Sequence, residues 1–94
     1  MSLVHVLHFW SPTCGPCMTI KPTIEMIKED LTEKHGDQVD WISINTKDDP
    51  KGRARSLNVS VVPTFVVFKG DVEVGRYSGT QIAILLAIIG KAFS

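Results

Sequence analysis

The sequence predicts an α/β fold whose elements follow one another in the order β-α-β-α-β-β-α. Three observations support this order: an apolar run over 3–10, apolar residues at helical steps over 17–31, and two β-rich runs joined by Gly70-Asp71. A strand, a helix and a second strand in succession give a parallel pair, and a tight hairpin adds an antiparallel pair. We therefore expect a four-stranded mixed sheet flanked by helices.

The first helix is expected directly after the first strand. Residues 3–10 are rich in Val, Leu and Phe and too few for a helix of ordinary length, which favours a mostly buried strand. The period then changes, and apolar positions fall on one helical face: Cys17, Ile20, Ile24, Ile27 and Leu31. Gly36 is the expected C-cap, and Pro22 is expected to bend this helix rather than end it.

The second half of the chain is expected to contain three strands and two helices. A strand is predicted over 39–45, and a short surface helix that starts at Pro50 is predicted within 47–58. The hairpin strands are expected over 61–69 and 72–78.

The last helix is expected to begin after Thr80 as its N-cap. Its predicted core stripe follows helical spacing: Ile82, Leu85, Leu86, Ile89 and Phe93. Ile84 and Ile88 lie off this stripe, and we expect them to be exposed rather than covered by a second subunit.

Length and composition restrict the classes of function. The 94 residues (10.4 kDa) predict a single domain over 1–94, and the 44% hydrophobic and 21% charged residues fit a globular protein. Lys and Arg residues equal Asp and Glu residues in number, so no net charge favours nucleic acid or an anionic membrane. The N-terminus has no pattern of a secretory signal, and we expect a cytoplasmic monomer.

The chemistry is expected at the only two cysteines, in Cys14-Gly15-Pro16-Cys17, where the first strand meets the first helix. At a helix start, backbone N–H groups without an intrahelical acceptor point at the Cys14 sulfur and stabilise its thiolate. The helix dipole contributes only about 0.3–1 kcal/mol, so direct hydrogen bonds, including one from the Cys17 amide, must supply the rest. Gly15 allows close backbone approach, and Pro16 fits an early helical position.

The two cysteines are expected to have different roles. Cys17 belongs to the apolar stripe and should face inward, whereas Cys14 stays at the exposed tip. Cys14 would then attack a substrate disulfide, and Cys17 would resolve the mixed disulfide and release the reduced substrate. This exchange requires no bound cofactor.

Three other interpretations of the cysteine pair were weighed. A structural disulfide would close so small a loop that it would constrain the unfolded chain little. A zinc site could use His5 and His8 with both cysteines, but on a strand these two histidines point to opposite faces. A coincidental pair is disfavoured by its position at the helix start.

These residues resemble the thioredoxin family. The resemblance rests on the run from Phe9 to Cys17, on Pro22, on Val62-Pro63-Thr64 and on Gly79. It implies a thioredoxin-like sheet of order 2-1-3-4, a cis Val62–Pro63 bond beside the cysteines, protein disulfides as substrates and a separate reductase as electron donor. It also implies a shallow substrate groove, formed by Trp10, Thr13, Gly15, Pro16, Val62, Pro63 and Gly79.

The chain departs from the family pattern in four respects. Thr13 stands where the family usually has Trp, which removes an aromatic wall from the groove. The strand and helix that commonly precede the first strand are missing, so strand 39–45 is expected at an exposed edge. His8 corresponds to the family's buried acid, and Ser43 to the Lys that often accompanies it.

His8 therefore allows two interpretations. Its imidazole would accept the Cys17 proton and match neutral pH better than a carboxylate, or it is a core histidine bonded to a backbone group.

The predicted function is that of a thiol–disulfide oxidoreductase that reduces protein disulfides. Two alternatives remain at this stage: an enzyme of glutaredoxin-like, oxidant or isomerase type, and a binding module that uses the same groove without turnover.

Overall fold

The computed structural model describes residues 3–94 and contains a four-stranded sheet with the order β2-β1-β3-β4. The strands are β1 (Val4–Trp10), β2 (Val39–Asn45), β3 (Thr64–Lys69) and β4 (Val72–Ser78), and the helices are α1 (Gly15–His35), α2 (Arg53–Ser56) and α3 (Ile82–Phe93), with a 3-10 turn at Gly36–Gln38. β2 runs parallel to β1, and the other two pairs are antiparallel. The predicted element order, strand order and exposed β2 edge are confirmed.

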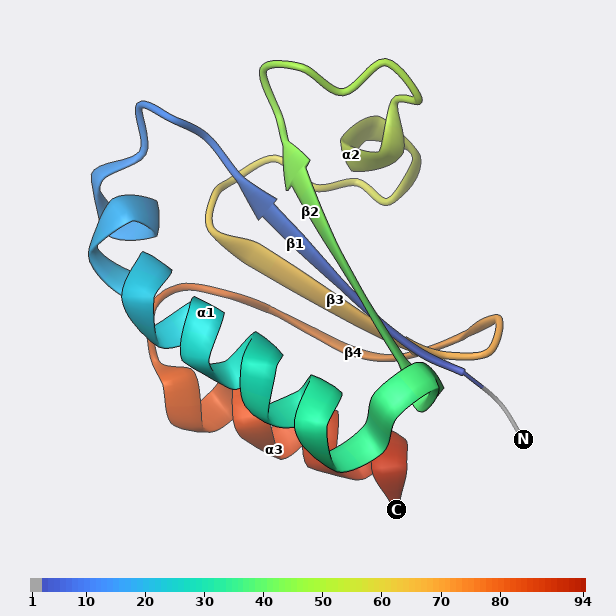
Figure 1. Cartoon of the computed structure of the whole chain (residues 1–94). Coiled ribbons are helices and arrows are strands. Elements are labelled where there is room, and N and C mark those ends of the chain that lie inside the picture. Colours follow the sequence, from blue (N-terminus) through green and yellow to red (C-terminus); the bar gives the residue numbers. More distant parts are fainter. Residues whose placement is uncertain (1–2) are drawn as a thin grey trace.

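Helices cover both faces of this sheet (Figure 1). On the face covered by α1 and α3, a core joins strand and helix residues: Val4, Val6, Phe65, Val67, Ile20, Ile24, Leu31, Leu85, Ile89 and Ala92. On the opposite face, which we call the α2 face, a smaller core contains Leu7, Phe9, Ile44 and Val66. The two sets alternate along β1 and β3 because successive strand side chains point to opposite faces.

α1 begins after Cys14 and continues through Pro22 to His35. Its buried residues are Cys17, Ile20, Ile24 and Leu31, four of the five positions predicted for the buried face. The predicted C-cap is confirmed, because Gly36 has a φ of 57° and its N–H donates to the carbonyl of Thr32. Packing of the buried face keeps the helix continuous although Pro22 lacks an N–H donor.

The prediction for α3 was partly wrong. The N-cap is Gln81 rather than Thr80, and Leu86, predicted in the core, is 47% exposed. The buried residues of α3 are Leu85, Ile89 and Ala92, and the predicted residues Ile82 and Phe93 are half-buried and pack against the same core. The face of α3 that meets the core is therefore rotated from the predicted one, toward Ala92 and away from Leu86.

Ile88 was expected to be exposed but packs against the core beside β4. Gly75 of β4 leaves room for it, since a Cβ at that position would lie 3.1 Å from Ile88 Cγ2.

The segment that contains α2 also differs from the prediction. The helix spans only four residues from Arg53 and does not start at Pro50. The Asp49 carboxylate determines this start, because it accepts hydrogen bonds from the N–H groups of Arg53 (3.2 Å) and Ala54 (2.9 Å). β3 likewise begins at Thr64 and not at residue 61.

Across residues 3–94, no helix combines the length and the apolar character that crossing a membrane requires.

Candidate active site

The two cysteines are joined as a disulfide at the N-terminus of α1, with Cα atoms 5.2 Å apart. Cys14 is the N-cap residue, and its sulfur accepts a hydrogen bond from the backbone N–H of Cys17 at 3.1 Å. The first helical turn contains no acidic residue that would oppose a negative charge on this sulfur. This is the local environment that stabilises a thiolate.

The two sulfur-bearing residues differ in exposure. Cys17 is 2% exposed because it starts the buried stripe of α1, whereas Cys14 is half-buried at the tip of the helix. An attacking group can therefore reach Cys14 from solvent, whereas the sulfur of Cys17 is shielded.

A second segment lies against Cys14. The Cys14 sulfur is 3.7 Å from the carbonyl oxygen of Val62, and the Val62–Pro63 peptide bond is cis, as the family resemblance implied. The N–H of Gly79 donates to the carbonyl of Pro63 at 3.1 Å. Three of the predicted segments, far apart in sequence, therefore meet at one end of the sheet.

The tip of α1 presents Thr13, Gly15 and Pro16 to solvent. The Thr13 hydroxyl lies 3.0 Å from the hydroxyl of Ser11, and the Thr13 N–H donates to the same Ser11 oxygen. The Thr13 side chain and N–H are thus hydrogen-bonded to Ser11 within the same turn. The surface next to Cys14 is more polar, and protrudes less, than it would be with an aromatic side chain at position 13. Within the chain, a Cβ on Gly15 would meet no atom within 4 Å.

A cavity of about 200 Å³ opens beside Cys17. Its lining combines apolar and titratable groups: His8, Trp10, Cys17, Met18, Lys21, Ile24, Glu25 and Ser43. His8 on β1 and Ser43 on β2 are register partners. Two of the four departures from the family pattern therefore line the same cavity. Met18, Lys21 and Glu25 were not predicted as site residues, although their steps of three and four along α1 place them on the helix side next to Cys17.

His8 is 7% exposed, and its ring stacks on Phe65 with centroids 4.5 Å apart. Its Nε2 atom is buried without a hydrogen-bond partner among the described residues. Burial lowers the pKa of His8 to about 4, so the imidazole is neutral at neutral pH. The expected advantage of His8 over a carboxylate at neutral pH is therefore wrong, because burial has removed it.

The two histidines considered for a zinc site lie on opposite sides of the sheet. His5 has its Nδ1 atom 3.4 Å from a carboxylate oxygen of Asp40, whereas His8 lies in the cavity beside Cys17. In the part of the chain from residue 3 onward, no group of three or more His, Cys, Asp or Glu side chains is placed to hold a metal ion.

A redox-active Cys-X-X-Cys pair on a thioredoxin-like fold, with one sulfur exposed and one buried, defines a thiol–disulfide oxidoreductase. Comparison with known proteins agrees with this class. The Thioredoxin family model matches residues 2–90 of the chain, and the chain therefore belongs to the thioredoxin family.

Similar proteins include thioredoxins of cyanobacteria and chloroplasts. Thioredoxin 1 of Synechococcus elongatus is 29% identical over 86 residues, which cover 87% of this chain and 76% of that protein. The chloroplastic Thioredoxin F2 of Arabidopsis thaliana is 35% identical over 89 residues, which cover 95% of this chain and 45% of that longer protein.

Solved structures show the same fold. Thioredoxin from Fasciola hepatica superposes with a TM-score of 0.84 at 26% identity, covering 97% of this chain and 82% of that one. The long form of thioredoxin F from spinach chloroplast also gives 0.84, at 29% identity, covering 99% of this chain and 73% of that one.

Proposed function

We propose that this chain is one domain over residues 1–94 that reduces disulfides in protein substrates, with Cys14 as the nucleophile and Cys17 as the resolving thiol. The observation that carries the proposal is the hydrogen bond from the Cys17 N–H to the Cys14 sulfur, together with the burial of Cys17 behind it. The bond stabilises negative charge on the exposed sulfur, and burial keeps the second thiol from reacting with substrate directly.

The exchange proceeds in two balanced steps. The Cys14 thiolate attacks one sulfur of the substrate disulfide, forms a mixed disulfide and expels the other substrate sulfur as a thiolate. Cys17 then loses its proton and attacks the Cys14 sulfur, which breaks the mixed disulfide and frees the second substrate thiolate. Two electrons pass to the substrate, and the Cys14–Cys17 disulfide remains until a separate dithiol reductase returns them.

The proposed docking surface surrounds the exposed sulfur. Its residues are those that the family resemblance implied: Trp10, Thr13, Gly15, Pro16, Val62, Pro63 and Gly79. The carbonyl oxygen of Val62 lies 3.7 Å from the reacting sulfur, and the Val62 backbone would pair with an extended substrate segment. Pro63 is buried and acts through the backbone that it positions.

His8 is proposed to accept the proton of Cys17. Its neutral imidazole and Cys17 line the same cavity, and the buried Nε2 atom has no other partner among the described residues. The imidazolium formed would lie beside the Cys17 thiolate, which raises the basicity of His8 during the step. The cavity then connects His8 to solvent, to which the proton leaves.

Insulin reduction with Cys14→Ser and Cys17→Ser tests the assignment of the cysteines. Cys14→Ser should abolish turnover, whereas Cys17→Ser should accumulate a mixed disulfide with insulin, detected by mass spectrometry. Equal yields of trapped adduct from both variants would show that the two roles are assigned incorrectly. If the protein binds insulin but insulin is reduced no faster than by the free dithiol alone, the protein is a binding module.

His8→Asn and His8→Asp test the proton acceptor. His8→Asn should lower kcat about tenfold or more with KM within about twofold, because general-base contributions reach that size or beyond. His8→Asp should recover part of kcat with a changed pH profile. An unchanged pH profile of kcat in His8→Asn would leave His8 with a structural role only.

The proposal also covers the oligomeric state and the cellular location of the protein. We propose that the protein acts as a monomer, which light scattering of the reduced and oxidised protein tests. We also propose that it acts in the cytoplasm, and fractionation of cells that express the tagged full-length protein tests this location.

A further inference from the structure

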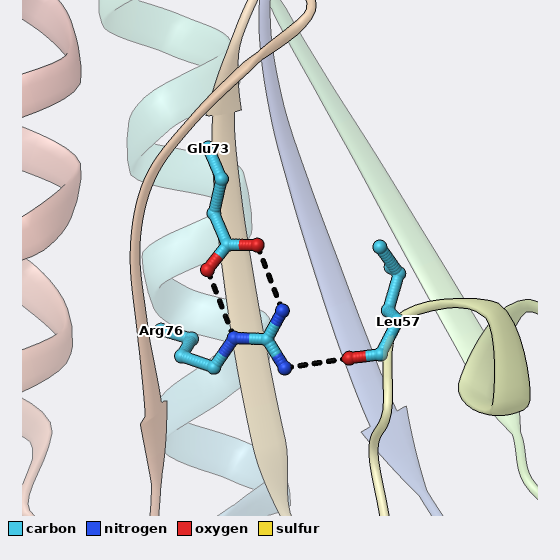
Figure 2. A network of polar contacts seen from close by, with 3 residues as sticks. All are labelled: Leu57, Glu73 and Arg76. Atoms are coloured by element: carbon cyan, nitrogen blue, oxygen red, sulfur yellow. Dashed lines mark hydrogen bonds and ion pairs between the residues drawn. The ribbon is translucent and has the colours of Figure 1, made fainter.

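An arginine on the edge strand β4 reaches across the α2 face to the segment that carries Val62 and Pro63 (Figure 2). Arg76 donates from Nη1 to the carbonyl oxygen of Leu57 at 2.7 Å. Its Nε and Nη2 atoms donate to the two carboxylate oxygens of Glu73, at 2.9 Å and 2.7 Å. These hydrogen bonds lower the pKa of Glu73, so the pair stays ionised at neutral pH.

A β-bulge makes this pair possible. Residues three apart on a regular strand point to opposite faces. In β4 the register shifts so that Val67 is paired with Gly75 and Phe68 with Glu73, which leaves one extra residue, Val74, between them. Glu73 and Arg76 are thereby placed on the same face, and Glu73 holds the guanidinium in one orientation.

The carbonyl that Arg76 binds is at the end of α2, where no intrahelical donor is left for it. Leu57 is the C-cap of α2, and the chain turns directly after it through Asn58, whose φ is 57°. Backbone N–H groups of residues 57–59 donate to carbonyls of α2, and the hydrogen bond from Arg76 joins this start of segment 57–63 to β4.

β4 and the residue after it also hold the rest of segment 57–63. The Thr64 hydroxyl donates to the carbonyl of Val61 at 2.7 Å and lies 2.7 Å from the hydroxyl of Ser78. The N–H of Gly79 donates to the carbonyl of Pro63. One end of segment 57–63 is thus bound by Thr64 and Gly79, and Arg76 is the residue of β4 that binds the other end, which is remote from Cys14.

Side-chain packing transmits this position to the reacting sulfur. Leu57, Val59 and Val62 pack against the same core on the α2 face, so a shift at Leu57 changes the support of Val62. The carbonyl oxygen of Val62 lies 3.7 Å from the Cys14 sulfur. Glu73 binds the guanidinium through two parallel hydrogen bonds, which hold it in the orientation that donates to the carbonyl of Leu57.

We propose that Arg76 is a positioning residue for disulfide exchange: held by Glu73, it fixes segment 57–63 and thereby the backbone on which protein substrates dock. This inference rests on the proposed function. A folded protein substrate needs the docked backbone, whereas a small aryl disulfide needs only the exposed Cys14 sulfur. Loss of Arg76 therefore weakens docking of the protein substrate and leaves the reaction with the small disulfide unchanged.

The experiment compares two substrates in single turnover of the prereduced protein. Insulin and the small disulfide dithiobis(nitrobenzoate) are titrated, and the half-saturating concentration and limiting rate are measured for Arg76→Met, Arg76→Lys and Glu73→Gln. Arg76→Lys keeps the charge but not the planar fork, so it separates geometry from electrostatic steering. Arg55→Met, an exposed arginine of α2, is the matched control.

We expect Arg76→Met and Arg76→Lys to raise the half-saturating concentration of insulin about fivefold to tenfold, since the docking contacts form when the substrate binds and are equally present in the transition state. The limiting rate, the reaction with the small disulfide and the Arg55→Met control should stay within about twofold of wild type. Glu73→Gln should show a smaller change in the same direction. If Arg76→Met does not fold, Arg76→Lys and Glu73→Gln decide.

Unchanged insulin saturation in the Arg76 variants would overturn this inference alone, provided that the wild type reduces insulin. An equal loss on both substrates, in proportion to a lower melting temperature, would also overturn it. A wild type that reduces neither substrate would overturn the proposed function and this inference with it.

Discussion

The two faces of the sheet are held in different ways. The α1/α3 face is covered by helices of 21 and 12 residues and contains buried side chains from both. The α2 face is covered by a helix of four residues and by segment 57–63, which polar contacts from Asp49, Thr64 and Arg76 hold in place. One face depends mainly on apolar burial, and the other also depends on individual hydrogen bonds.

This difference matches a division of chemical tasks. The buried sulfur of Cys17 and the imidazole of His8 lie on the α1/α3 face, where both line the cavity beside Cys17. Val62, against which Cys14 lies, belongs to the α2 face. We therefore expect substitutions of apolar core side chains on the α1/α3 face to change mainly stability, and substitutions in segment 57–63 of the α2 face to change mainly substrate docking.

The largest effect is expected for Leu85→Ala on the α1/α3 face. Leu85 is fully buried, and removing such a side chain costs about 3 to 5 kcal/mol of unfolding free energy because a cavity remains. Denaturant unfolding measures this loss. Leu86→Ala, one residue later and 47% exposed, is the control and should change stability by less than about 1 kcal/mol. Similar losses in both variants would contradict the described α3 stripe.

The next effect is a pH dependence that arises from His8. Its pKa is about 4 in the folded protein and about 6.5 in the unfolded chain, so the unfolded chain binds the extra proton between these values. The unfolding free energy should therefore fall as the pH is lowered from about 6.5 to 4, by at most about 3 kcal/mol, and His8 should add no further loss below pH 4.

Denaturant unfolding of wild type and His8→Leu at several pH values isolates this contribution. The difference between the two proteins should change over that pH range and stay constant above it. A constant difference at every pH would show that His8 titrates normally in the folded protein.

Leu57→Ala tests whether the packing of segment 57–63 on the α2 face determines substrate docking. Leu57 is only half-buried, and we expect a loss of about 1 to 2 kcal/mol. The half-saturating concentration of insulin should nevertheless rise several-fold, because Val62 loses its support. Leu57→Met serves as the control that keeps most of the side-chain volume. A variant that loses stability but binds insulin normally would separate segment 57–63 from docking.

The smallest effect is expected for Asp49→Ala at the start of α2. Loss of its two bonds to the N–H groups of Arg53 and Ala54 should cost about 1 kcal/mol, as for other N-terminal caps. The neighbouring Asp48→Ala is the control. Thermal unfolding of both variants checks the difference, and equal melting temperatures would show that the Asp49 contacts contribute nothing.

The sequence was sufficient where strong local signals agree. Strand–helix periodicity, the Gly70-Asp71 turn and the position of Cys14 before a helix with Cys17 on its buried face predicted the sheet and the placement of both sulfurs. The cis Val62–Pro63 bond came from the family resemblance, because base rates for X–Pro bonds favour trans. Helical spacing could not show that Ala92 is buried and Leu86 exposed, since this depends on which side of α3 packs against the sheet.

The contact between Arg76 and Glu73 was not predictable from the sequence. Strand periodicity places these residues on opposite faces, and only the bulge at Val74 brings them together. Likewise, the pKa of His8 depends on how closely Phe65 and its neighbours exclude water, which no local pattern specifies. Both features arise from contacts between segments distant in the chain.

The most direct test of the proposed mechanism is alkylation of the fully reduced protein by iodoacetamide at neutral pH, followed by peptide mass spectrometry. The hydrogen bond to the Cys14 sulfur and the burial of Cys17 predict that Cys14 is modified at least about tenfold faster than Cys17. Equal rates, or faster modification of Cys17, would contradict the proposal that Cys14 is the nucleophile and Cys17 the shielded resolving thiol.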